Sequence, residues 1–105
     1  KFLSEAPRLG RSFIGGYQCV FWPTKADKRV TITGKGAGPV VVVGTTGDPA
    51  TPLASTRKMA AALQDGRLIV VTGDRHTGYG INACVVSAVD EYLVSASVPF
   101  REKAC

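Results

Sequence analysis

Val-Val-Val-Val-Gly-Thr-Thr-Gly-Asp, residues 40–48, contains the clearest strand signal in this chain. Its four consecutive valines form a β-branched run between Gly38-Pro39 and Gly44. Such a run is typical of a strand that is buried on both faces of a parallel sheet. We therefore expect a strand over about 40–44 and an α/β fold.

The residues after this strand predict a helix and then a second strand. The helix is expected over about 52–65. Thr51 can cap its N-terminus, Pro52 suits its first position and Gly66 is placed to end it. The short apolar run 68–71 predicts the second buried strand.

A second helix is expected over about 82–94, with Asn82 as its N-cap. Its apolar positions recur at spacings of three and four residues: Val85, Val86, Val89 and Leu93. The predicted order is strand, helix, strand, helix. Because two parallel strands cannot cover both faces of a sheet by themselves, this part of the chain looks like the edge of a larger sheet.

Residues 1–38 differ in character from residues 39–105. They are rich in glycine and proline, and their apolar residues follow no period, which indicates an irregular arm or linker. A short strand is expected at residues 30–33. Seven basic and two acidic residues lie in this arm, whereas residues 39–105 are neutral. Since the basic residues form no dense run of lysine and arginine, we expect a solvated or partner-facing surface and no nucleic-acid binding.

Length and composition place the chain among small globular domains. It has 105 residues, of which 45% are hydrophobic and 20% charged. The valine run at residues 40–43, like every other apolar run of the chain, is far too short for a membrane span, and the N-terminus lacks the pattern of a signal peptide. Because the chain opens on Lys1 and its single methionine is Met59, we expect a processed product or a piece of a longer protein.

Two polar side chains follow the two predicted strands at matching distances. Asp48 lies five residues after Val43, and His76 lies five residues after Val71. Neighbouring parallel strands would bring both side chains out at the same end of the sheet, where α/β proteins gather catalytic groups. A carboxylate on one imidazole nitrogen fixes the tautomer, while the other nitrogen can take a proton from a nucleophile.

Simpler interpretations of these residues remain open. Asp48 before a proline can be a turn former, and a lone histidine in a glycine-rich loop is often merely exposed. The loop 44–47 could instead cradle a phosphate, although it lacks both glycine-rich nucleotide patterns. No Gly-x-Ser-x-Gly elbow is present, and Thr45 and Thr46 come nearest to a nucleophile in this chain.

The cysteines do not predict a metal site. Cys19, Cys84 and Cys105 lack Cys-x-x-Cys spacing, and a single histidine leaves too few zinc ligands. The odd count indicates one disulfide and one further cysteine, without saying which pair forms. We expect neither a metal nor a cofactor.

Several stretches resemble a known family. From Gly38 onward the chain contains Gly-Asp-Pro-Ala-Thr-Pro at 47–52, the histidine loop Gly-Asp-Arg-His-Thr-Gly at 73–78, Asn-Ala-Cys at 82–84 and a final Cys105. With the upstream Cys-Val-Phe-Trp-Pro at 19–23, these resemble the C-terminal domain of tripeptidyl-aminopeptidase-like α/β-hydrolases, exported serine hydrolases typical of actinobacteria.

This resemblance implies the last two core strands of an α/β-hydrolase, with Asp48 and His76 as the acid and the histidine of a Ser-Asp-His triad. It also implies a Cys84–Cys105 disulfide, a partner for Cys19 in a preceding part, and a secreted or cell-envelope location. The chain differs from the family at Arg75, because the residue before the family's histidine is usually small.

The function expected from the sequence is that of a C-terminal fragment of a secreted serine hydrolase that acts on peptides or esters. Its nucleophile would lie in the preceding part of the hydrolase, so the fragment alone should be inactive. As a fragment, the chain should also be poorly stable alone or self-associate, because the strands that should cover residues 40–43 would be missing. The alternative is a non-catalytic interaction module that pairs with another chain through an exposed sheet edge.

Overall fold

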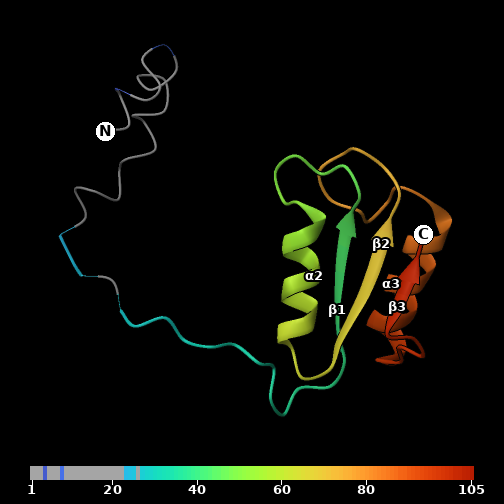
Figure 1. Cartoon of the computed structure of the whole chain (residues 1–105). Coiled ribbons are helices and arrows are strands. Elements are labelled where there is room, and N and C mark those ends of the chain that lie inside the picture. The colour runs from blue at the N-terminus through green and yellow to red at the C-terminus, as the bar shows by residue number, and fades with distance from the viewer. Residues whose placement is uncertain (1–3, 5–7, 9–22, 26) are drawn as a thin grey trace. The chain divides into compact units, whose positions relative to one another are not determined.

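The computed structural model describes residues 4, 8, 23–25 and 27–105 (Figure 1). The chain divides into two compact units, Lys1–Val30 and Thr31–Cys105. The strands and helices described below all belong to the second unit. Cys19 and the rest of its motif up to Trp22 lie outside the described residues.

The sheet of the second unit is parallel and contains β1 (Val40–Thr45), β2 (Gly66–Val71) and β3 (Glu102–Ala104) in that order. Val40 pairs with Gly66 and Thr45 with Val71, so the two long strands run in register over their whole length. Both predicted strands are confirmed. The third strand was not predicted, because its three residues contain no apolar run.

Helix α2 (Leu53–Ala62) is shorter than the predicted 52–65. Pro52 occupies the N-cap position without a side-chain cap, so the prediction that Thr51 caps the helix is wrong. The helix ends where Leu63 becomes extended, and Gly66 begins β2 instead of ending the helix. A side chain at Gly66 would collide with the Ala60 carbonyl, so glycine permits the tight helix-to-strand turn.

Helix α3 (Ala83–Ser95) begins as predicted, because the Asn82 side chain accepts a hydrogen bond from the Val85 N–H at 3.0 Å. It ends at Ser95, and the next residue, Ala96, adopts the left-handed conformation common after helices. Val85 is fully buried, but Leu93 is 72% exposed. Leu93 thus shares the helical period of Val85 without sharing its burial.

The two helices cover opposite faces of the sheet. Alternate strand residues point to opposite faces. A side chain at Gly44 would meet Thr56 of α2. Val43, the strand residue before Gly44, faces the other way and packs against a core shared with α3. This core consists of Ile69, Val71, Val85 and Ala88, and Val41 also packs against it. The unit is thus a layered α/β arrangement with its core on the α3 side.

Strand β1 is less buried than predicted, since the sequence predicted a strand buried on both faces. Residues 40–43 are only half-buried, because no strand in the described residues pairs with β1 on the side away from β2. The predicted strand at 30–33 is absent, and Val30 and Ile32 are 82% and 75% exposed. Within the described part of the chain, no helix is long and apolar enough to cross a membrane.

Candidate active site

The loop after β1 wraps around the carboxylate of Asp48. Its Oδ1 accepts hydrogen bonds from the main-chain N–H groups of Ala50 and Thr51 at 2.8 and 2.9 Å. Its Oδ2 accepts from the Thr51 hydroxyl at 2.6 Å and from the Thr77 N–H at 3.3 Å. The Asp48 side chain is only 2% exposed, so these donors replace water around the carboxylate.

These donors favour the charged form of Asp48. The hydroxyl and N–H of Thr51, followed by the Ala50 N–H and by His76, hold the pKa of the Asp48 carboxyl well below its ordinary value, although burial opposes them. Asp48 is therefore an anion at neutral pH.

The loop after β2, residues 73–80, carries His76 toward this carboxylate. Thr77 adopts a φ of +69°, which is uncommon for a residue with a branched side chain. The N–H of the same residue donates to Asp48, and this contact helps hold the strained backbone. Gly78 is buried against Val43 and Val71, where an added Cβ would lie 2.7 Å from a Val43 methyl group.

The two loops are also joined directly. The Thr46 hydroxyl donates to the Gly73 carbonyl and accepts from the Gly73 N–H, both at 3.0 Å. The Gly47 N–H donates to the same carbonyl at 2.7 Å. Figure 1 shows the two loops beside each other beyond the arrowheads of β1 and β2.

Asp48 and His76 meet, as their matched positions after the strands predict. His76 Nδ1 lies 3.0 Å from Asp48 Oδ2 and 3.2 Å from Oδ1, although 28 residues separate the two in sequence. The acid is buried, whereas the His76 side chain is 55% exposed. A buried carboxylate can thus orient an imidazole whose Nε2 is free to exchange a proton with a substrate or a nucleophile.

The described residues do not place a nucleophile at His76. Thr46 is engaged by Gly73, and the Thr45 hydroxyl is buried without a hydrogen-bond partner. Among the hydrogen bonds of the described residues, the only hydroxyl near the imidazole is that of Thr51, 3.5 Å from Nδ1. Nor do the described residues contain a cluster of three or more groups that could hold a metal ion.

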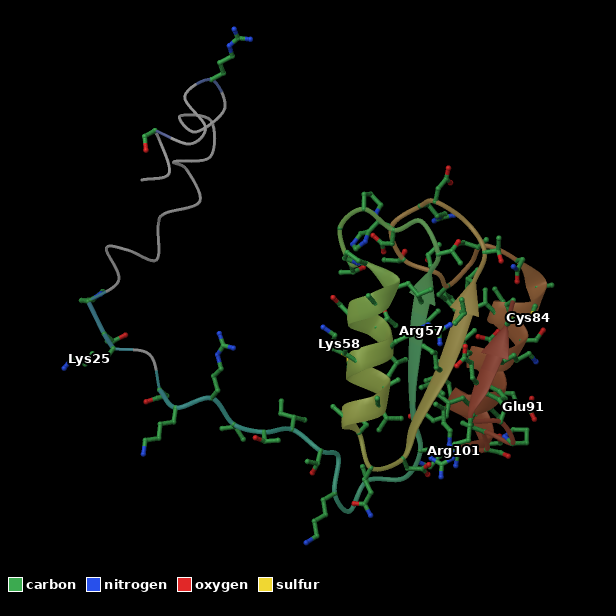
Figure 2. The ribbon with its side chains drawn as sticks, viewed as in Figure 1. Lys25, Arg57, Lys58, Cys84, Glu91 and Arg101 are labelled. Carbon is green, nitrogen blue, oxygen red and sulfur yellow. A yellow bond between two sulfur atoms is a disulfide. The ribbon has the colours of Figure 1, made fainter. Side chains whose placement is uncertain are left out.

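A disulfide joins Cys84 of α3 to Cys105, with 5.6 Å between their Cα atoms. Figure 2 shows Cys84 at the end of α3 that begins after the histidine loop. The Asn82 side chain donates to the Cys105 carbonyl at 2.8 Å while it caps α3. The link therefore fixes the end of β3 to the start of the helix that follows His76.

Further contacts stabilise the two ends of the sheet. Tyr79 donates to Asp90 of α3 at 2.8 Å, and this hydrogen bond raises the pKa of the Tyr79 phenol. At the end away from the site, Arg101 lies beside the start of β3 (Figure 2), 3.4 Å from Asp65. Arg57 of α2 forms an exposed ion pair with Glu102 at 2.9 Å.

Sequence reasoning missed Thr51 and Thr77 as members of the site. The spacing Asp-Pro-Ala-Thr at 48–51 contained a signal for the first, because an aspartate can accept hydrogen bonds from residues two and three positions further along. Thr77 has no such signal, since its role depends on contact between two separate loops.

The parallel sheet with helices on its two faces is a partial α/β-hydrolase fold. The chain belongs to the TAP-like protein family, whose sequence profile matches residues 6–105. This finding confirms the family resemblance seen in the sequence.

Its relatives are hydrolases of three kinds. The chain is 39% identical to carboxylesterase B of Mycobacterium tuberculosis over 89 residues, which cover 83% of this chain and 17% of the relative. It is 34% identical to serine protease Hip1 of the same organism over an alignment of 107 residues, which covers 100% of this chain and 19% of the relative. It is 30% identical to the tripeptidyl aminopeptidase of Streptomyces coelicolor over 90 residues, covering 83% and 17%. The chain thus spans less than a fifth of the length of these curated relatives.

Proposed function

We propose that this chain is the C-terminal part of a serine hydrolase and contributes the acid and the histidine of its catalytic triad. Asp48 orients His76 through Nδ1, and Nε2 of His76 takes the proton of a serine and later gives it to the leaving group. The serine belongs to a preceding part of the hydrolase, and the chain alone is inactive.

One observation carries this proposal: the contact of 3.0 Å between His76 Nδ1 and the buried, charged Asp48. A turn-forming aspartate would not need an imidazole beside it, and a merely exposed histidine would not need a carboxylate held by four further hydrogen bonds. The arrangement suits the stabilisation of an imidazolium that forms during acyl transfer.

The proposed substrates are peptides or esters, and the serine attacks their carbonyl group. Relatives named as a protease, an aminopeptidase and a carboxylesterase support both forms. The preceding part of the hydrolase would pair with the free edge of β1 and build most of the substrate pocket. The Cys84–Cys105 disulfide supports a secreted or cell-envelope location, where disulfides persist.

Labelling with a fluorophosphonate probe tests this function, because the probe reacts with an activated serine and needs no known substrate. In the intact hydrolase that carries this chain, we expect one labelled serine and a loss of labelling in His76→Ala and Asp48→Asn. Asp74→Asn is the matched control, since Asp74 is exposed and has no hydrogen bond or ion pair in the described structure. A His76→Ala protein that labels at the wild-type rate would contradict the proposal.

The chain by itself provides a second arm of the experiment. We expect no adduct when the isolated chain is incubated with the probe and its intact mass is measured. An adduct on Thr45, Thr46 or any serine of the chain would overturn the view that the nucleophile lies in a preceding part.

A further inference from the structure

The Thr51 hydroxyl contacts both members of the proposed acid–histidine pair. Its Oγ1 lies 2.6 Å from Asp48 Oδ2, which is the shortest of the hydrogen bonds to this carboxylate. The same atom lies 3.5 Å from His76 Nδ1. Neither the acid role of Asp48 nor the base role of His76 requires a hydroxyl at this point, so its placement calls for a separate explanation.

We propose that Thr51 is a positioning residue, which holds the Asp48 carboxylate in the orientation that faces His76. This inference rests on the proposed function. The strength of the acid–histidine pair then depends on the Thr51 hydroxyl, which comes from the turn before α2.

The division of donors between the two carboxylate oxygens supports this role. Two main-chain N–H groups, from Ala50 and Thr51, hold Oδ1. The oxygen nearer to His76 is Oδ2, and besides His76 it has only the Thr51 hydroxyl and the longer, 3.3 Å bond from Thr77. Rotation about the Cβ–Cγ bond of an aspartate is otherwise soft. Without the hydroxyl, Oδ2 would keep only the long bond from Thr77 and the contact with His76 itself, so its orientation toward Nδ1 would be fixed less firmly.

The hydroxyl also acts on the charge of the pair. The side chain of Thr51 is the largest cause of the lowered pKa of Asp48. It therefore favours the carboxylate form that can accept a hydrogen bond from His76 and stabilise the imidazolium. Because Oδ1 keeps both of its donors, loss of the hydroxyl should weaken the pair without abolishing it.

Fluorophosphonate kinetics on the intact hydrolase test the proposal. The maximal labelling rate at saturating probe reports the activation of the serine, and the half-saturating probe concentration reports probe binding. For Thr51→Val we expect the maximal rate to fall by roughly tenfold, because one hydrogen bond to a charged group is lost. The half-saturating concentration should stay unchanged. Thr51→Ser keeps the hydroxyl and should label within about twofold of the wild-type rate.

Three further variants keep this test decisive. Thr72→Val is the matched control, since Thr72 is exposed and makes no hydrogen bond in the described structure, and we expect it to label like the wild type. Thr51→Ala removes the hydroxyl without a bulky methyl group and should repeat the defect if Thr51→Val does not fold. His76→Ala is measured in parallel to test the proposed function itself.

The outcomes separate the two proposals. If Thr51→Val and Thr51→Ala label at the wild-type rate while His76→Ala does not label, the positioning role is wrong and the proposed function stands. If Thr51→Ser is as slow as Thr51→Val, the residue acts through packing of its methyl group, which also overturns the positioning role. If His76→Ala labels normally, the proposed function fails.

Discussion

Thr46 and Gly73 exchange two hydrogen bonds through a single hydroxyl oxygen, which donates to the Gly73 carbonyl and accepts from the Gly73 N–H. The two residues lie just beyond neighbouring strands, 27 positions apart in sequence. The contact therefore links the loop of Asp48 to the loop of His76 before either loop reaches the site.

Removal of this link should weaken both loops together. For Thr46→Val we expect the free energy of unfolding to fall by about 1 kcal/mol, because two exposed hydrogen bonds are lost while the Gly73 carbonyl keeps its bond from the Gly47 N–H. Thr46→Ser keeps the hydroxyl and should lose little. Denaturant unfolding of the purified chain measures the difference, and equal stability of Thr46→Val and the wild type would show that the link does not hold the loops.

The histidine tautomer should be fixed by Asp48. His76 is the only histidine of the chain, so its ring nitrogens can be observed by nuclear magnetic resonance without overlap. We expect the neutral ring to have its hydrogen on Nδ1, which faces Oδ2 at 3.0 Å. Asp48→Ala should abolish this preference, whereas Asp74→Ala should not. A ring with its hydrogen on Nε2 in the wild-type chain would be inconsistent with the contact.

Stability should depend on pH through Asp48 in a defined direction. Its folded-state pKa lies below the ordinary value of 3.8, so the unfolded chain binds a proton before the folded chain does. The stabilisation is fully present above that ordinary value and is lost as the pH falls below it. We expect the Tm difference between the wild type and Asp48→Asn to be constant above about pH 5 and to shrink between about pH 4 and pH 2. A difference that grows in acid would contradict the assignment.

Reduction of the Cys84–Cys105 disulfide should destabilise the C-terminal part of the chain. The bridge spans 21 positions, and a loop of this length corresponds to about 3 kcal/mol in the chain-entropy account. Cys84→Ser should therefore lower the free energy of unfolding by about 3 kcal/mol, and a reductant should have no further effect on this variant. Cys19→Ser serves as the control, because Cys19 is not part of this bridge. Equal stability of Cys84→Ser and the wild type would contradict this expectation.

The parts of the fold that could be predicted are those with a local pattern. The valine run at 40–43 and the Asn82 cap concern neighbouring residues only, and the structure has both as expected. The meeting of Asp48 and His76 was also predictable, because parallel pairing fixes where the ends of two strands lie.

The features that sequence reasoning missed depend on contacts between distant residues. Glu-Lys-Ala at 102–104 has no strand pattern, and it is a strand because β2 offers a free edge and Cys105 is bonded to α3. Threonine is favoured both at helix N-caps and in turns, so the residue type of Thr51 could not distinguish a helix cap from a donor to Asp48. Leu93 follows the helical period, but it lies in the last turn of α3 and is exposed.

The position of β2 has a consequence for amide hydrogen exchange. In the described part of the chain it is the only strand with neighbours on both sides, and Ile69 and Val71 are fully buried. Its amide hydrogens should therefore exchange with solvent more slowly than those of β1 or β3, since they open only when much of the unit unfolds. His76 follows five residues beyond the end of this segment, so the loop of the proposed base begins at the part of the unit that is expected to open least often.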